Sequence, residues 1–443
     1  METTKGFIFD YSKCVGCHAC MIACYVENST KPPLSWRQVN HFNKEKLPLL
    51  GFIHLSIACN HCADAPCLKA CPSGAYYVDK ETNAVIHTPE LCIGCKYCTW
   101  ACPFDAPKYN PDRGIIEKCH FCYHRLKENE LPACALNCPT GALSFGEITK
   151  DSNPNAIGLS KQEIYPRISV RGSEVLHTVP LSDINSTGLN EKDIEKFHKR
   201  NDDQSVSPLH EWPLAVFTFI GALLCGWIWS SIMPNSIKIN FWLFGILGAL
   251  AMIISALHLG KPLRSYLSVL NFKSSWLSRE ILLFGLFIIS GISALILQIN
   301  VLLIITGIVG LAFLISVEMV YNITQKRYST PIHSANTISI ALTFAVVFSQ
   351  IWSVLIALLA LKTMLFVIRQ GSKQFVYQPF ISFITFFRLT LGFLIPFGYL
   401  AFTEMSFSWI FAGSVILGEA IDRLMYYGDF EPERPFENVS LQK

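Results

Sequence analysis

Residues 118–139 read KCHFCYHRLKENELPACALNCP and contain four cysteines at uneven spacing. Two residues separate Cys119 from Cys122, eleven separate Cys122 from Cys134, and Cys138 stands directly before a proline. This spacing does not form a complete metal-binding motif by itself. Its meaning therefore depends on the cysteines that lie N-terminal to it.

Sixteen of the chain's 17 cysteines lie between Cys14 and Cys138 and form four groups of four. The first and third groups have the spacing CxxCxxCxxxC, the second has CxxCxxxxCxxxC, and the fourth is the opening stretch. In chain order the groups are Cys14, Cys17, Cys20 and Cys24; Cys59, Cys62, Cys67 and Cys71; Cys92, Cys95, Cys98 and Cys102; and Cys119, Cys122, Cys134 and Cys138. A repeat of this regularity indicates one shared chemical role for the thiols.

The CxxCxxC loop is typical of proteins that hold 4Fe–4S clusters. Its three thiolates wrap around one cluster, and a fourth cysteine, after three intervening residues, ligates a second cluster. We expect that fourth cysteine to begin a helix, because Pro72, Pro103 and Pro139 follow it in three groups and proline suits a helix's first turn. Tyr25 takes this place in the first group. Each group then lends its last cysteine to a partner group, and the sixteen thiolates suffice for four 4Fe–4S clusters.

Zinc and disulfides explain the cysteines less well. Structural zinc sites use CxxC pairs, and a triple CxxCxxC loop suits them poorly. The first residues, METTKGFIFDYSKC, contain no apolar segment as long as that of a signal peptide and no twin arginine. We therefore expect the cysteine-rich half to be made in a reducing compartment, where dense cysteine indicates metal binding.

The 443 residues divide into two halves of different composition. Residues 1–209 carry 22 Lys and Arg and 23 Asp and Glu, whereas residues 210–443 carry only 14 and 10. The net charge of the whole chain is +3, which gives a nucleic-acid partner no electrostatic support. The sequence predicts a thiol-rich soluble domain followed by a hydrophobic region.

The second half contains repeated apolar segments near the length of about twenty residues that a membrane span needs. We predict helices at 212–233, 239–259, 280–298, 301–321, 335–350, 353–369, 388–403 and 406–424. Residues 336–368 form one apolar run that would measure about 50 Å as a single helix, which is too long for a bilayer. We therefore expect a tight turn at Gln350 and about eight spans in total.

Both halves resemble subunits of one reductase family. Within residues 6–148, CVGCHACMIAC, CNHCADAPCLKACPSGA, CIGCKYCTWACPFDAP and CPTGAL resemble the four-cluster iron–sulfur subunit of the dimethyl sulfoxide reductase family. Between residues 210 and 428, HEWPL, ALHLGKPLRSYLSVLNFKSSWLSREI and GEAIDRLMYYG resemble its membrane anchor subunit. We expect an α+β ferredoxin-like domain at 1–148, a polar linker at 149–209, an all-α polytopic anchor with a quinol site at 210–428, and a tail at 429–443.

Spacing alone leaves open which cysteine groups pair. In the family that the chain resembles, the first group pairs with the fourth and the second with the third. Carried over, this implies four ligand sets. They are Cys14, Cys17, Cys20 and Cys138; Cys24, Cys119, Cys122 and Cys134; Cys59, Cys62, Cys67 and Cys102; and Cys71, Cys92, Cys95 and Cys98.

Basic residues are distributed unevenly around the predicted helices. With eight spans, one face collects twelve Lys and Arg residues, and the opposite loops offer only Lys238. The twelve are Lys261, Arg264, Lys273, Arg279, Lys326, Arg327, Arg369, Lys373, Arg388, Arg423, Arg434 and Lys443. The positive-inside rule then places the iron–sulfur domain on the cytoplasmic face of a bacterial or archaeal cytoplasmic membrane. The resemblance implies the alternative, because members of the family typically face outward.

Five ionisable residues are expected at the helix ends that lie toward the iron–sulfur domain. They are His258, Glu280, Glu318, Arg388 and Glu419. A quinol loses two protons while its electrons leave, so it needs proton acceptors near the membrane surface. His258 titrates near neutrality and is the first candidate for quinol deprotonation, and the other four are candidates for its surroundings. For each glutamate alone, a charge that faces water or lipid headgroups is the simpler explanation.

Together these features predict an electron-transfer and anchor subunit that carries electrons from membrane quinol through four clusters. The resemblance implies a separate catalytic subunit with a molybdenum or tungsten pterin, which reduces dimethyl sulfoxide, another S- or N-oxide or nitrate in anaerobic respiration. One alternative is reverse flow, from a dehydrogenase to quinone. Another is an ion-translocating redox module, for which the mid-helix Lys362 offers support, although snorkelling or pairing with a neighbouring helix explains that lysine more simply.

Overall fold

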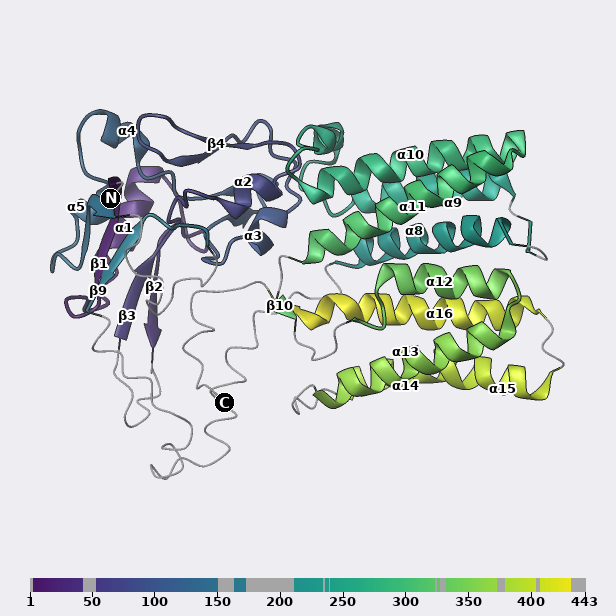
Figure 1. The fold of residues 1–443 in the computed structure, drawn as a ribbon. Helices are drawn as coiled ribbons and strands as arrows, with labels where there is room; N and C mark the ends of the chain where they lie inside the picture. Colours follow the sequence, from purple (N-terminus) through teal and green to yellow (C-terminus); the bar gives the residue numbers. More distant parts are fainter. Residues whose placement is uncertain are drawn as a thin grey trace, which may run out of the picture. The chain divides into compact units, whose positions relative to one another are not determined.

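The computed structural model describes residues 3–42, 53–149, 163–172, 211–233, 236–238, 240–322, 325–326, 332–372, 379–403 and 407–431 (Figure 1). The chain forms two compact units. Unit 1 comprises Met1–Asp203, Leu263–Ser274 and Pro432–Lys443, and unit 2 comprises Gln204–Pro262 and Ser275–Glu431. Most of the predicted linker and tail lies outside the described residues. Leu263–Ser274 belongs to unit 1, although helices of unit 2 flank it in the sequence.

A three-stranded sheet organises the core of unit 1. Its central strand, β1 (Thr3–Asp10), pairs antiparallel with β8 (Leu143–Thr149) and parallel with β9 (Ile168–Arg171). Side chains alternate between the two faces of a strand, and Phe7 and Phe9 on one face of β1 are buried. The sheet therefore joins the start of the chain to residues that follow the last cysteine group.

Hairpins and short helices carry the cysteine loops in the described part of unit 1. The hairpins are β2 (Gln38–Phe42) with β3 (Ile53–Ile57), β4 (Tyr76–Val78) with β5 (Val85–His87), and β6 (Lys108–Asn110) with β7 (Ile115–Glu117). The helices are α1 (Ala19–Asn28), α2 (Pro66–Ala70), α3 (Tyr97–Ala101), α4 (Tyr123–Lys127) and α5 (Ala133–Leu136). Together with the sheet, these elements form an α+β domain.

The prediction that the last cysteine of each group begins a helix is wrong. Cys24 lies inside α1, and Cys71 and Cys102 are the residues that cap the C-terminal ends of α2 and α3. Cys138 likewise follows the end of α5. A proline just beyond a helix stops it from continuing. The prolines in this position are Pro72, Pro103 and Pro139.

Unit 2 is helical. Its helices are α8 (Trp212–Ser231), α9 (Phe241–Ala256), α10 (Trp276–Leu297), α11 (Asn300–Tyr321), α12 (Thr337–Phe348), α13 (Trp352–Ser372), α14 (Pro379–Leu389), α15 (Ile395–Phe402) and α16 (Trp409–Tyr426). The π-helical segment η5 (Thr390–Leu394) joins α14 to α15 without a break. The tight turn predicted at Gln350 is confirmed, because α12 ends before it, α13 begins after it, and its φ is +59°.

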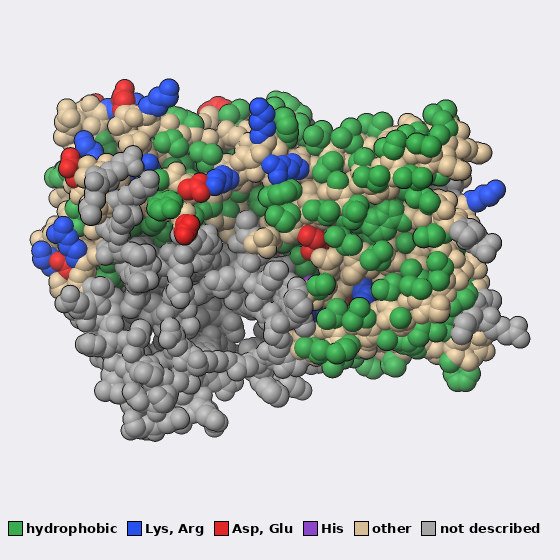
Figure 2. Space-filling view, viewed as in Figure 1, with side chains coloured by type: hydrophobic (Ala, Val, Ile, Leu, Met, Phe, Trp, Pro, Cys, Tyr) green, Lys and Arg blue, Asp and Glu red, His purple; other side chains and the backbone are tan. Residues whose placement is uncertain are grey.

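Five helical segments in the described residues are long and apolar enough to cross a membrane. They are Trp212–Ser231, Trp276–Leu297, Asn300–Tyr321, Trp352–Gln370 and Phe383–Phe402. The apolar helices α9 and α12 are shorter, and α16 carries three charged residues near its C-terminal end. Apolar side chains cover the visible surface of these helices (Figure 2), as expected for a region that contacts lipid.

Candidate functional site

The thiols of unit 1 lie close together in four sets. All of the cysteines are free of disulfide bonds. Electrostatic interactions join Cys14 to Cys17, Cys20 and Cys138; Cys119 to Cys24, Cys122 and Cys134; Cys62 to Cys59, Cys67 and Cys102; and Cys71 to Cys95 and Cys98, with Cys92 joined to Cys71 and Cys95. We call these the first, second, third and fourth sets. The resemblance implies the same grouping of ligands, which stays a prediction.

The four sets form a row within unit 1. Cys20 of the first set interacts with Cys134 of the second. Cys119 of the second set interacts with Cys59 of the third. Cys98 of the fourth set interacts with a third-set cysteine, Cys67. Neighbouring sets are therefore in electrostatic contact, in the order first, second, third, fourth.

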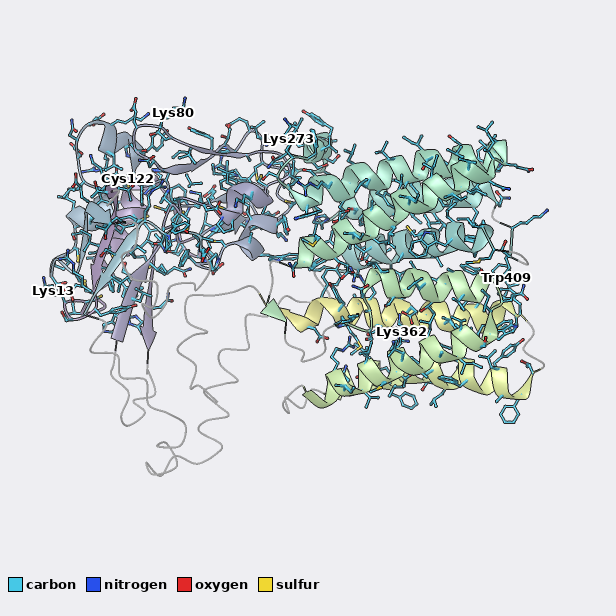
Figure 3. All side chains as sticks on the ribbon, in the orientation of Figure 1. Lys13, Lys80, Cys122, Lys273, Lys362 and Trp409 are labelled. Carbon is cyan, nitrogen blue, oxygen red and sulfur yellow. The ribbon has the colours of Figure 1, made fainter. Side chains whose placement is uncertain are left out.

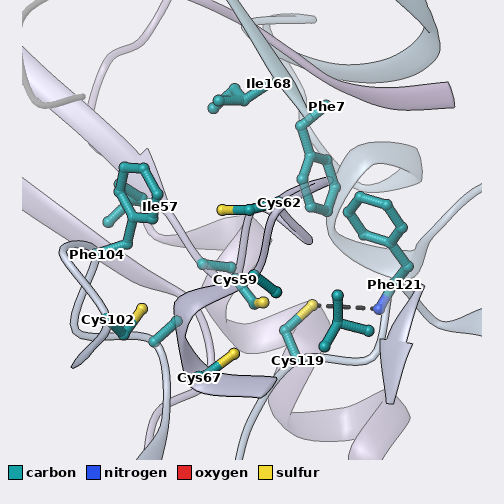
Figure 4. Packing of buried hydrophobic residues seen from close by; sticks show 14 of the residues in the cluster. Phe7, Ile57, Cys59, Cys62, Cys67, Cys102, Phe104, Cys119, Phe121 and Ile168 are labelled. Atoms are coloured by element: carbon teal, nitrogen blue, oxygen red, sulfur yellow. Dashed lines mark hydrogen bonds between the residues drawn. The ribbon is translucent and has the colours of Figure 1, made fainter. Parts of the chain in front are cut away.

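Cavities lie among the thiols of the first two sets. One cavity is lined by Cys14, Cys17, Cys20 and Cys138, and another by Cys24, Cys119, Cys122 and Cys134. Cys59, Cys62, Cys67 and Cys102 of the third set lie together in the buried interior (Figure 4). In the described residues, no group of three or more His, Cys, Asp or Glu side chains is arranged to hold a single metal ion. Ligands of a 4Fe–4S cluster each bind a different iron.

Burial controls the protonation of these thiols. Desolvation raises the pKa of Cys24 and of Cys102 to about 12 and that of Cys122 to about 11. Free thiols with such pKa values are protonated at neutral pH, whereas metal ligands are thiolates. Binding of iron at these positions would therefore release protons, and acid would weaken it.

Backbone N–H groups point at several of the sulfurs. The N–H of Phe121 donates to Cys119 Sγ over 3.4 Å (Figure 4), and the N–H of Ala75 donates to Cys71 Sγ over 3.3 Å. Such donors stabilise negative charge on sulfur and tune the potential of an iron–sulfur cluster. The short turns of this domain thus place N–H groups beside the thiols, which cysteine spacing alone does not reveal.

Residues of the segment Leu263–Ser274 form hydrogen bonds with the backbone around the fourth set. Arg264 Nη1 donates to the carbonyl oxygens of Pro89 and Cys92 over 2.8 and 3.1 Å. Asn271 Nδ2 donates to the carbonyl of Cys71 over 2.8 Å. Two residues of this segment therefore hold two cysteines of one set. From the sequence, Arg264 was expected only to be a loop charge.

The structure divides the five quinol-site candidates between separate places in unit 2. His258 lies in the turn after α9, where its Nδ1 contacts the carbonyl of Ser255. A carbonyl only accepts, so Nδ1 carries the proton and Nε2 of the neutral ring is the acceptor. This tautomer suits a base that removes a proton from a hydroxyl group.

Glu280 and Glu318 lie near the guanidinium of Arg423. Glu280 on α10 is buried and interacts electrostatically with Arg423 and Glu318. Glu318 Oε1 is 3.8 Å from Arg423 Nη1 and accepts hydrogen bonds from the N–H and hydroxyl of Thr337. Arg423, which was expected among the charges on one face of the helices, is therefore buried beside these carboxylates.

Arg388 and Glu419 are paired inside a larger buried ionic cluster. Glu419 binds Arg388 at 3.2 Å and Lys362 at 2.6 Å. Asp422 binds Arg369 at 2.9 Å and Arg388 at 3.2 Å, and both side chains of each of these two pairs are fully buried. The pairing expected for Lys362, which lies among the helices of unit 2, is confirmed (Figure 3).

The expectation that Arg388 lies at a helix end is wrong. The continuous helical segment begins at Pro379, nine residues before Arg388, because the apolar residues that precede the arginine extend the helix. The charge count around the helices also changes. Arg369, Arg388 and Arg423 are fully buried with carboxylate partners, so they do not mark exposed loops. Arg327, Lys373, Arg434 and Lys443 lie outside the described residues.

Two family models match the protein. Residues 51–148 match a 4Fe-4S dicluster domain, and residues 206–396 match the DMSO reductase anchor subunit (DmsC). The 4Fe-4S dicluster match covers the second, third and fourth cysteine groups. The anchor subunit match begins before α8 and ends in α15.

Curated relatives match the cysteine-rich half. YnfG of Escherichia coli (strain K12), part of a probable anaerobic dimethyl sulfoxide reductase, is 40% identical over 156 residues, which are 33% of this protein and 76% of the relative. The thiosulfate reductase electron transfer subunit PhsB of Salmonella typhi is 37% identical over 172 residues, 38% of this protein and 88% of the relative. A polysulfide reductase subunit of Wolinella succinogenes is 37% identical over 184 residues, 41% of this protein and 96% of the relative.

These matches agree with the division of the protein into a thiol-rich half and a helical half. The relatives cover the first half of the protein over most of their own length, and the anchor model covers the helical half. The chain therefore belongs to the dimethyl sulfoxide reductase family, as a 4Fe–4S electron-transfer subunit fused to its membrane anchor subunit.

Proposed function

We propose that this protein carries electrons from membrane quinol through four 4Fe–4S clusters, held by the four thiol sets, to a separate catalytic subunit. The observation that carries the proposal is the row of thiol sets, with Leu263–Ser274 bound to the fourth set at one end. The clusters would accept and pass one electron at a time. The protein's own residues hold them, exclude water and position the quinol.

Chain connectivity sets an upper limit on the distance between the quinol candidate, His258, and the fourth set. His258 is six residues from Arg264, and six extended residues span about 20 Å. Arg264 binds the carbonyl of Cys92. The separation of His258 from this fourth-set residue therefore cannot exceed the length of six extended residues plus the length of the arginine side chain. This covalent limit supports the fourth set as the first electron acceptor.

His258 would act on the quinol hydroxyl. Its Nε2 would take one proton as an electron leaves the ring, and the second proton and electron would follow to complete the oxidation to quinone. The hydrogen bond from Nδ1 to the Ser255 carbonyl would hold the ring in the tautomer that this step requires. Of the other candidates, Glu280 would serve the later proton transfer, since Glu419 is bound by Arg388 and Lys362 and Glu318 accepts two hydrogen bonds from Thr337.

The buried ionic cluster does not favour the ion-translocating alternative. Arg369 and Arg388 stand between its carboxylates, and guanidinium groups do not deprotonate in proteins. A proton path through the cluster would therefore be interrupted at each arginine. We infer that the cluster joins α13, α14 and α16 to one another in the membrane region.

The partner would be a molybdenum or tungsten pterin enzyme. The relatives are named as parts of reductases for dimethyl sulfoxide, thiosulfate and polysulfide, which supports an S- or N-oxide or another sulfur compound as the terminal oxidant. We propose that the iron–sulfur domain faces the cytoplasm. Lys261, Arg264, Lys273 and Arg279 still favour that side after the buried arginines are removed from the count.

A His258→Ala variant tests the proposal. We expect quinol to reduce the clusters in the native protein and to fail in the variant, while dithionite reduces both and the iron content stays equal. Reduction would be followed by electron paramagnetic resonance of the full-length protein in lipid nanodiscs. A matched His333→Ala variant should retain quinol oxidation, because His333 is committed to Asp429 at 3.1 Å. Normal quinol oxidation by His258→Ala would refute the assignment.

A further inference from the structure

Arg37 is a fully buried cation that the sequence analysis did not single out. It lies directly before β2 in unit 1, and its side chain is 2% exposed. Lysine and arginine are almost never fully buried unless they are paired. The partners of this guanidinium therefore need explanation.

The protein satisfies only part of the Arg37 side chain. Nη1 donates to the hydroxyl and the carbonyl of Ser56 over 3.1 and 3.3 Å. The guanidinium carbon lies 4.4 Å from the centre of the Phe7 ring. Nε and Nη2 are buried without a hydrogen-bond partner, and no carboxylate of the described residues forms an ion pair with Arg37. An isolated buried charge is strongly unfavourable, so a counter-charge is expected nearby.

The surroundings of Arg37 identify that counter-charge. Arg37 lines the same cavity as Cys24, Cys119 and Cys134. The side chains that interact most strongly with its charge are cysteines of the first and second sets: Cys134, Cys20, Cys119 and Cys24. Ser56, which accepts from Arg37, is also 3.2 Å from Cys20 Sγ. The unpartnered N–H groups thus belong to a side chain that borders thiols of two sets.

We propose that Arg37 is the shared counter-charge of the clusters held by the first and second sets, and that its free N–H groups donate to cluster sulfur. This inference rests on the proposed function, which assigns clusters to those sets. An iron–sulfur cluster with four thiolates is negatively charged and gains a further negative charge on reduction. A fixed cation beside it stabilises the reduced state most, and so raises the reduction potential.

The position of Arg37 in the row of thiol sets would favour electron flow in one direction. The first and second sets lie at the end of the row that is opposite the set bound by Leu263–Ser274. Higher potentials at this end would draw electrons along the row, away from the set that receives them and toward the end where a catalytic partner would take them. Arg37 would therefore act through its positive charge on the clusters, without contact to a substrate.

A substitution series at position 37 separates charge from hydrogen bonding. Arg37→Lys keeps the charge and loses the planar set of donors, Arg37→Gln keeps donors without the charge, and Arg37→Met removes both. Arg113→Met is the matched control, because that side chain is 57% exposed and already paired with Glu117. Redox titration with electron paramagnetic resonance would give the reduction potentials of all clusters in the full-length protein, together with its iron and sulfide content.

We expect Arg37→Gln and Arg37→Met to disfavour reduction of one or two clusters by at least tenfold, which corresponds to a fall of about 59 mV. The other clusters should stay unchanged, Arg37→Lys should fall between the native and neutral proteins, and Arg113→Met should match the native protein. Unchanged potentials in Arg37→Met with full iron content would overturn the inference.

Loss of clusters in the neutral variants is also informative. Retention of iron by Arg37→Lys but not by Arg37→Met would support the counter-charge, because the retained charge is what Lys shares with the native arginine. Equal loss in both variants would overturn it and assign Arg37 to packing. The proposed function fails separately: a native protein without clusters refutes it, whereas a native protein with clusters and indifferent Arg37 variants refutes only the role of Arg37.

Discussion

Buried cations behave differently in the two units. In unit 2, Lys362, Arg369 and Arg388 each contact a carboxylate within 3.3 Å. In unit 1, Arg37 and Lys118 are just as buried, yet no carboxylate of the described residues pairs with either. Lys118 instead donates to the carbonyl oxygens of Val85 and Cys119. The helical unit neutralises its own charges, whereas the described part of the cysteine-rich unit provides no acidic partner for these two cations.

This difference indicates what completes unit 1. A polypeptide that leaves cations buried without acids requires negative charge from elsewhere. We propose that the sixteen thiolates of the four sets, with the iron they would hold, supply it. Unit 2 needs no such addition, because α13, α14 and α16 bring acids and bases together directly.

Removing an acid from unit 2 has the largest expected effect. Asp422→Asn leaves Arg369 and Arg388 with one carboxylate fewer at a fully buried position. We expect a loss of about 3–5 kcal/mol in the stability of the helical unit, since breaking a buried pair strands its partner. Thermal unfolding of the protein in nanodiscs, followed by tryptophan fluorescence, measures it.

The control for that experiment is a surface pair. Glu81→Gln affects a side chain that is 73% exposed and lies 3.5 Å from Lys127, and solvent-exposed pairs contribute little. We expect no measurable change in unfolding temperature. Equal losses in Asp422→Asn and Glu81→Gln would contradict the view that unit 2 depends on internal charge pairing.

A smaller effect is expected where Leu263–Ser274 joins unit 1. Asn271→Ala removes the donor to the Cys71 carbonyl, at a cost of about 1 kcal/mol. Hydrogen exchange of residues 263–274 should accelerate, and reduction of the fourth-set cluster by quinol should slow. Ser274→Ala, which loses a 3.2 Å contact at an exposed position, should change exchange less. Identical exchange in both variants would show that Asn271 does not hold the segment.

The smallest expected effect concerns Ser56, the hydrogen-bond partner of Arg37. Ser56→Ala removes a hydroxyl that lies between Arg37 and Cys20 but keeps the charge. We expect reduction of the first-set cluster to become less favourable by about 0.5–1.5 kcal/mol, the range of one hydrogen bond. Redox titration measures this change. A shift as large as that of Arg37→Met would mean that the hydroxyl, and not the charge, dominates.

The sequence revealed features that depend on local spacing. Short stretches of residues determine the cysteine repeats, the apolar segments and the turn at Gln350. The spacing of residues was therefore enough to predict them. The prolines after the cysteines were misplaced relative to their helices, because a proline is compatible with a helix start and with the residues just past a helix end.

Features that depend on tertiary contacts escaped sequence reasoning. Arg388 and Arg423 read as loop charges, since only the packed helices reveal Glu419, Asp422 and Glu318 beside them. Arg37 carries no motif, and its importance appears only when thiols from distant groups surround it. An arginine inside a thiol-rich domain that lacks a nearby acid in the sequence is the one signal that could have drawn attention to it.

Metal analysis of the purified full-length protein tests the central claim most directly. Four 4Fe–4S clusters require about sixteen irons and about sixteen acid-labile sulfides per molecule, together with electron paramagnetic resonance signals from interacting clusters after reduction. A protein that contains zinc, disulfides or no metal in place of this iron and sulfide would contradict the assignment of the four thiol sets and of everything that follows from it.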